Sequence, residues 1–120
     1  ENGYSLAWMH HKGRNRHHFE YWTDVSPATH RYEPLEMPTE FFVEMCMDRI
    51  AASRTYLKEN YHDGAPLEYL QRAGDNRWMH PRTARKLRFI LTMLRDRGEA
   101  ETFCFIREVV LKGLPFAEEE

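Results

Sequence analysis

Long hydrophobic runs are missing from this sequence. No apolar stretch in its 120 residues approaches the ~20 residues that a helix needs to cross a bilayer, and no signal peptide is visible. Cysteine is scarce as well: Cys46 and Cys104 are the only two, they fall in predicted helices, and their spacing is not that of a disulfide framework. We expect both to be small buried hydrophobic residues in a protein of the reducing cytoplasm, without a membrane partner.

The sequence also lacks a strong net charge, internal repeats, and the alternating runs of Val, Ile and Thr that predict strands. A net charge of −2 argues against a nucleic-acid coat and against an acidic tail. With 42% hydrophobic residues the chain has enough apolar material for a core, and 120 residues suit one domain. Because the chain begins with Glu1 rather than Met, either a tag was removed or the chain is the C-terminal part of a longer protein. We expect residues 1–120 to form a single helical domain of such a longer protein.

Helical periodicity, in contrast, is plentiful. The expected elements are short helices over residues 4–12 and 17–22, a loop over 23–37, a long helix over 38–60, a short helix from 66 that Gly74 ends, and two helices over 81–97 and 99–113 that Gly98 separates. Short connections between helices favour antiparallel neighbours. We therefore predict an all-α, compact helical domain of about five to six helices.

Two apolar stripes define the predicted core. One lies on the long helix, which we expect to carry Pro38 in its first turn, and comprises Phe42, Cys46, Ile50 and Leu57, with Met45 and Tyr56 beside it. The other lies on the two helices that flank Gly98 and comprises Leu87, Ile90, Leu91, Leu94, Phe103, Ile106 and Val110. The residues of the second stripe should be buried together, because the two helices present facing surfaces.

Histidine is concentrated near the start of the chain. Four of the seven histidines form the doublets His10-His11 and His17-His18, which flank a basic segment and are followed by Glu20. Neutral imidazole is a common metal ligand, and a carboxylate beside it fixes its tautomer. Adjacent helical residues point about 100° apart, so one histidine of each doublet would face a common point, and we favour His11 and His18. The alternative is that the doublets belong to an ordinary polar surface.

Two carboxylates of the long helix are candidate partners for these histidines. Glu44 and Asp48 are four residues apart and share a face of the helix, roughly opposite Cys46. Because apolar residues flank them, we expect both to be partly buried, and a buried acid needs a partner. One interpretation makes Asp48 a metal ligand and Glu44 a general base or a group that orients a ligand. The other is a salt bridge with Arg14, Arg16 or Arg49.

The helix over residues 81–97 is rich in positive charge. It carries Arg82, Arg85, Lys86, Arg88, Arg95 and Arg97 against a single acid, Asp96. Such a face can bind phosphates, but a solvated face balanced by nearby acids is the more frequent arrangement. His80 precedes Pro81 at the start of this helix, and we expect it to be a capping or turn residue.

Several segments together resemble a known family. Together they resemble an uncharacterised bacterial and phage family known only as a domain of unknown function. The matching segments are the run from His10 to Trp22, Met37-Pro38, Val43-Glu44-Met45-x-x-Asp48-Arg49-x-Ala51-Ala52-Ser53 and His80-Pro81-x-Thr83. Members of that family usually carry an upstream helical segment with a His-Asp doublet. We interpret this chain as lacking a His-Asp doublet altogether, which is its main departure from the family, so either an upstream piece was cut away or the family's site is incomplete here.

The family's arrangement, a His-Asp doublet on a helical segment, is similar to that of the HD superfamily. Helical domains of the HD superfamily bind one or two divalent metals and mostly hydrolyse phosphoesters. The resemblance implies that His11, His17 or His18 supplies middle metal ligands and that Asp48 supplies the closing carboxylate. A fold-level analogy does not by itself fix a function.

Two hypotheses from different classes follow. The first is a metal-dependent phosphohydrolase acting on a nucleotide or another small phosphorylated substrate, with a divalent Zn, Mn or Fe ion that makes hydroxide available near neutral pH. Arg14 or Arg16 would hold the phosphate, and Glu20 or Glu44 would move the proton. The second is a non-catalytic helical module that binds a protein or, less favoured, a nucleic acid through the basic helix, with structural histidines. We choose the first.

Overall fold

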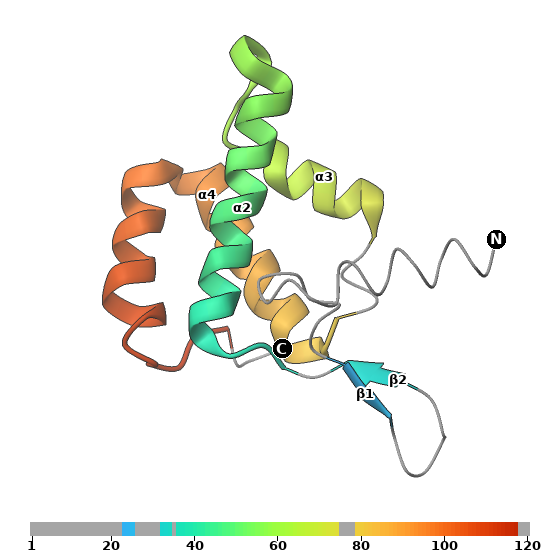
Figure 1. The fold of residues 1–120 in the computed structure, drawn as a ribbon. Coiled ribbons are helices and arrows are strands. Elements are labelled where there is room, and N and C mark those ends of the chain that lie inside the picture. The colour runs from blue at the N-terminus through green and yellow to red at the C-terminus, as the bar shows by residue number, and fades with distance from the viewer. Residues whose placement is uncertain (1–22, 26–31, 35, 75–78, 118–120) are drawn as a thin grey trace, which may run out of the picture.

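The computed structural model describes residues 23–25, 32–34, 36–74 and 79–117. Within them the chain forms, in order, the strands β1 (Thr23–Val25) and β2 (Tyr32–Pro34) and the helices α2 (Thr39–Leu57), η2 (Lys58–Asn60), α3 (Ala65–Ala73), α4 (Pro81–Phe105) and η4 (Ile106–Val110). Figure 1 shows that helices make up the body of the described structure and that the strands lie at one edge. The helical fold class is thereby confirmed, while the described residues contain three α-helices rather than five or six. The helices predicted over residues 4–12 and 17–22 lie outside the described residues.

Within the described residues, two short strands form a small β-ribbon. β1 and β2 pair antiparallel, with Asp24 opposite Glu33 and Val25 opposite Tyr32. The prediction of a loop over residues 23–37 is therefore wrong for these six residues. Three-residue strands are too short to show period-2 alternation, so the sequence pattern does not indicate them.

α2 is the long helix that the sequence predicted, and it starts one residue later than expected. Pro38 is the residue before the helix, with an extended backbone, and Glu40 occupies the first turn, where a carboxylate favours the positive end of the helix dipole. The α-helix ends at Leu57, and η2 continues it to Asn60 as a tighter 3₁₀ turn. Lys58, at this junction, has a φ of 53°, a rare conformation for a residue with a Cβ.

The predicted ends of the other helices are confirmed at three residues. Gly74 adopts the left-handed conformation that closes α3, and its N–H donates to the carbonyl of Leu70. His80 caps α4: its Nδ1 accepts a hydrogen bond from the backbone N–H of Arg82 at 3.1 Å. Gly98 breaks α4 with φ 88° and ψ 176°, so that the element consists of two helical segments. Figure 1 shows the last helical part of the chain running back beside α2.

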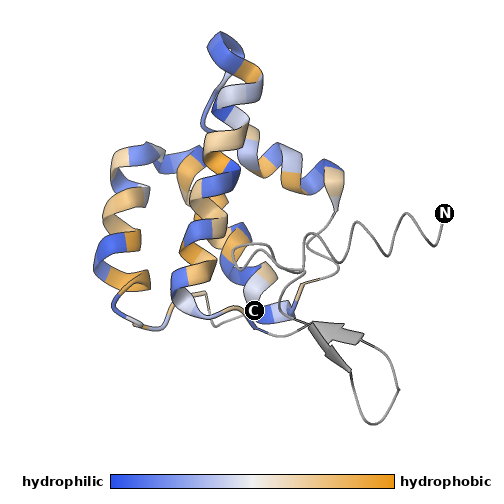
Figure 2. Ribbon diagram, viewed as in Figure 1, coloured by the Kyte–Doolittle hydropathy of each residue, from blue (hydrophilic) through white to orange (hydrophobic). Residues whose placement is uncertain are grey.

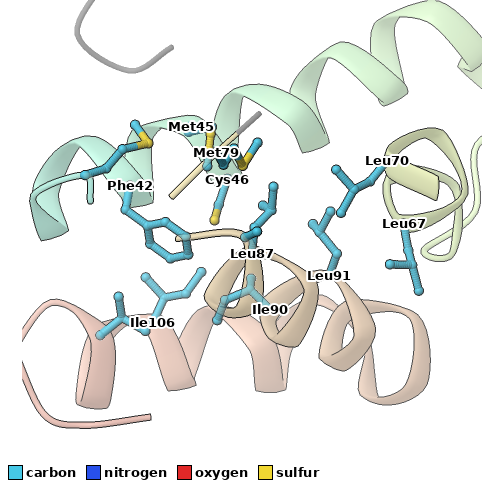
Figure 3. Packing of buried hydrophobic residues seen from close by; sticks show 13 residues of the cluster. Phe42, Met45, Cys46, Leu67, Leu70, Met79, Leu87, Ile90, Leu91 and Ile106 are labelled. Carbon is cyan, nitrogen blue, oxygen red and sulfur yellow. The ribbon is translucent and has the colours of Figure 1, made fainter. Parts of the chain in front are cut away.

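The core lies where α2, α3 and both parts of α4 meet. Figure 3 shows Phe42 and Cys46 of α2 directed toward Leu87 and Ile90 of α4, with Ile106 near the Phe42 ring, and Met45 belongs to the same buried cluster. Figure 2 shows apolar residues gathered between these helices. The predicted second stripe is confirmed: Leu87, Ile90, Leu91, Leu94, Ile106 and Val110 are buried, and Phe103 is partly buried against the core.

The first stripe is shorter than predicted. Phe42, Cys46 and Ile50 are buried, but Leu57 is only half-buried and Tyr56 is 87% exposed. Figure 1 shows the reason, because the end of α2 extends beyond the other helices. None of the helices in residues 36–74 and 79–117 combines the length and apolar character that spanning a bilayer requires.

Candidate functional site

The two carboxylates of α2 lie on its outer face. Glu44 and Asp48 are four residues apart and both are exposed, which confirms that they share a face. Asp48 is two residues, or about 200°, from the fully buried Cys46. The predicted partial burial of the two acids is wrong, because α3, α4 and η4 pack against the opposite face of α2.

Neither carboxylate is without a partner. Glu44, Asp48 and the neighbouring Arg49 each take part in at least one polar, ionic or ring interaction. Among the residues that the structure describes, no group of three or more His, Cys, Asp or Glu side chains is arranged to hold a metal ion. A metal centre on this face therefore requires ligands from outside the described residues, which is where the sequence analysis placed them.

The remaining predicted site residues lie in residues 1–22, outside the described part of the chain. They are the metal ligands His11, His17 and His18, the proton-transfer residue Glu20, and the phosphate-binding residues Arg14 and Arg16. Their convergence on Asp48 stays a prediction. What the structure contributes is one half of the candidate site: two solvent-facing carboxylates on a helix whose other face is fixed in the core.

The interpretation that this chain lacks a His-Asp doublet is wrong, because His62-Asp63 forms one in the turn between η2 and α3. His62 Nε2 lies 3.6 Å from Glu68 Oε1, and Asp63 Oδ2 lies 3.8 Å from the point where a Cβ on Gly98 would stand. The doublet thus lies against the kink of α4, beyond the end of α2, and not on the face of Glu44 and Asp48.

Charged and aromatic side chains gather around this doublet. Arg54 is paired with Glu99, and its guanidinium carbon lies 4.5 Å from the centre of the Tyr61 ring. Burial, and then the negative charge of Asp63, raise the pKa of the Tyr61 hydroxyl. This arrangement ties the end of α2 to the second part of α4, so we assign the turn a structural role.

The positive charges of α4 do not form one continuous face. Arg82 and Lys86 lie 3.9 and 3.3 Å from the carboxylate of Glu36, and Arg85 donates to a backbone carbonyl. Further along the helix, Arg95 and Arg97 pair with Asp96 and Glu101 respectively. Neighbouring acids therefore balance much of the charge, in agreement with the solvated-face interpretation.

The cysteines differ from each other. Cys46 is buried as predicted, and burial raises the pKa of its thiol to about 12, so it stays protonated and is no nucleophile. Cys104 is exposed, and its predicted burial is wrong. It lies on the outer side of the second part of α4, between the half-buried Phe103 and Phe105.

Comparison with known proteins gives a family and no biochemical activity. No curated protein and no solved structure matches the chain. A family described as "Family of unknown function (DUF5662)" matches residues 1–93, a span that holds both histidine doublets, the β-ribbon, α2, α3 and α4 as far as residue 93. Nothing in these comparisons links the family to HD phosphohydrolases. Since the match covers more than half of the sequence, the chain belongs to this family of unknown function.

Proposed function

We propose that this protein is a metal-dependent phosphohydrolase with an HD-like helical core, acting on a nucleotide or another small phosphoester. The observation that carries the proposal is the pair Glu44 and Asp48, exposed side by side on α2. They lie within the same family match as the two histidine doublets. Carboxylate together with neutral imidazole is the donor set that Zn, Mn and Fe accept.

The residues at hand fit such an ion chemically. Asp48 offers oxygen ligands on a rigid helix, and His11, His17 or His18 would supply nitrogen ligands. A helix whose opposite face is held by Phe42, Met45 and Cys46 keeps a ligand in place, as preorganised sites require. A bound divalent ion lowers the pKa of a water molecule, which provides hydroxide at neutral pH.

The chain's own residues would do the remaining work. Glu44, one helical turn before Asp48, is placed to accept a proton near the ligand, and Glu20 is the alternative base. Arg14 and Arg16 offer the fork of donors that suits phosphate oxygens. Exposure of the α2 face leaves room for a substrate to approach from solvent.

The test measures metal content and hydrolysis together. The full-length protein, purified without a His tag, is assayed by elemental analysis and with bis-p-nitrophenyl phosphate as substrate. Asp48→Asn should abolish metal uptake and hydrolysis while the helical signal in circular dichroism is retained. Glu44→Gln should retain the metal and lose hydrolysis, as expected for a proton-transfer group.

Glu40→Gln is the matched control. Glu40 is exposed on the same helix and is assigned no ligand role, so its variant should bind metal and hydrolyse substrate as the unsubstituted protein does. Equal metal content in Asp48→Asn and Glu40→Gln would refute the assignment of Asp48 as a ligand.

A second candidate is a non-catalytic module that binds a protein partner. It is favoured by the end of α2 and the adjoining α3, where Tyr56 and Tyr69 are 87% and 54% exposed and Arg72 lies 5.8 Å from the Tyr69 ring centre. Tyrosine and arginine are enriched where proteins bind one another. In that case the metal assay above gives no bound metal, and Tyr56→Ala weakens partner binding without loss of stability.

A further inference from the structure

The segment after the last helix packs onto the helices through one aromatic ring. The centre of the Phe116 ring lies 6.3 Å from that of Phe42, 5.7 Å from that of Phe89 and 5.5 Å from that of Phe105. The three rings come from α2 and from the two parts of α4. These separations are those of favourable tilted and edge-to-face ring pairs.

Two cationic side chains of α4 contact the same segment beside the ring cluster. Lys86 Nζ lies 5.3 Å from the centre of the Phe116 ring, within the range of a cation–π contact. Arg85 Nε donates a hydrogen bond of 3.0 Å to the carbonyl of Ala117. The helices thus recognise two features of the segment at once: an aromatic ring, and the carbonyl of the residue that follows it.

Phe116 packs against the hydrophobic core, whereas the two residues before it do not. The segment follows Gly113, whose φ is 74°, and Leu114 and Pro115 are exposed. Ala117 has a φ of 54°, which is unfavourable for a residue with a Cβ. Its conformation therefore works against the contacts that hold it, which makes the segment easier to displace.

We propose that Phe42, Phe89, Phe105, Lys86 and Arg85 form a peptide-binding site, which residues 114–117 occupy in cis as an intramolecular ligand. The occupant to which this site is suited is a protein segment that carries a phenylalanine followed by a free backbone carbonyl. The chain's own segment demonstrates the fit, because it satisfies the ring contacts and the hydrogen bond. This inference is independent of the proposed hydrolase activity.

While residues 114–117 occupy the site, they block the binding of a peptide from another protein. A tethered segment competes with a free peptide at an effective concentration in the millimolar range. A partner segment binds only after residues 114–117 leave the site. Phe89, which is 39% exposed while Phe116 is in place, marks the side from which the partner would approach.

The test adds the segment in trans. The peptide acetyl-Leu-Pro-Phe-Ala-amide is titrated into the full chain and into Phe116→Ala, with binding followed by NMR chemical shifts. We expect the peptide to bind Phe116→Ala at least about tenfold more tightly than the unsubstituted protein, because the competing ring has been removed. The peptide in which alanine replaces the phenylalanine should not bind either protein.

Two further variants separate a specific site from a loosened surface. Leu111→Ala changes an exposed residue that precedes the segment and should behave as the unsubstituted protein. Adding Lys86→Ala to Phe116→Ala should weaken peptide binding severalfold. If Phe116→Ala fails to fold by circular dichroism, Phe116→Leu keeps an apolar side chain and should still bind the peptide more tightly than the unsubstituted chain. Binding that is equal in the variant and the unsubstituted chain, or absent from both, overturns the proposal.

Discussion

Gly98 offers the most direct test of the fold, because the kink in α4 depends on its backbone alone. At φ 88° and ψ 176° it lies in a region that only glycine populates readily. A Cβ at this position would meet only Asp63 Oδ2, at 3.8 Å, an ordinary contact distance. Gly98→Ala therefore introduces conformational strain without a steric clash.

The magnitude follows from two opposing terms. Forcing alanine into this region costs about 1–3 kcal/mol, and the reduced freedom of the unfolded chain returns about 0.4–1 kcal/mol. We expect a net loss of about 1–2 kcal/mol in the free energy of unfolding. Alanine also favours a continuous helix, which would carry Ile106 and Val110 away from the core. Loss of the kink would thus add to the destabilisation rather than relieve it.

Urea unfolding followed by circular dichroism measures the loss. Gly113→Ala is the control, since Gly113 also has a positive φ, of 74°, with nothing within 4 Å of the added Cβ and no role in the kink. The control should lose about 1 kcal/mol and keep its fluorescence and chemical shifts in the core. An unchanged or raised stability of Gly98→Ala would mean that α4 runs straight through residue 98, and the packing of its two parts described above would be refuted.

Three further changes test other features of the fold by the same measurement. Leu91→Ala removes a fully buried side chain and should cost about 2–5 kcal/mol, whereas a loss below about 0.5 kcal/mol would place Leu91 outside the core. Lys58→Gly should raise the free energy of unfolding by about 1 kcal/mol, because Lys58 has a φ of 53° that glycine adopts without strain. A decrease would show that the Lys58 side chain makes a contact that stabilises the fold by more than the strain costs. His80→Ala should cost about 0.5–2 kcal/mol through loss of the cap on Arg82 N–H, and no change would mean that solvent replaces the cap fully.

The sequence was most informative where one residue determines local geometry. Gly74, Gly98 and His80 were each placed at a helix end, because a missing Cβ or a side-chain acceptor acts within a few residues of its own position. The second apolar stripe was placed equally well, since its period determines which side chains share a face. These features need no knowledge of what lies across from them.

Tertiary arrangement explains the failures. Helical spacing put Glu44 and Asp48 on one face, but whether that face is covered depends on other elements, and the packed elements lie on the opposite side. Tyr56 lies beside the apolar stripe and is nevertheless exposed, because the end of α2 extends beyond the helices that cover it (Figure 1). For the candidate site, the predicted ligands fall in two segments of the sequence; only Asp48 of α2 lies in the described residues, so their convergence stays a prediction.

The residues that precede α2 and the Phe116 segment are held by the same helix, α4. The N–H of Met37 donates to the buried Thr83 Oγ1 at 3.1 Å, and Lys86 reaches Glu36 on one side and the Phe116 ring on the other. The chain that leads into α2 and the segment that follows the last helix are therefore held by neighbouring residues of one helical face. Because Lys86 contacts both, a peptide whose phenylalanine takes the place of Phe116 would keep both contacts of the Lys86 ammonium group, one with the ring and one with the carboxylate of Glu36.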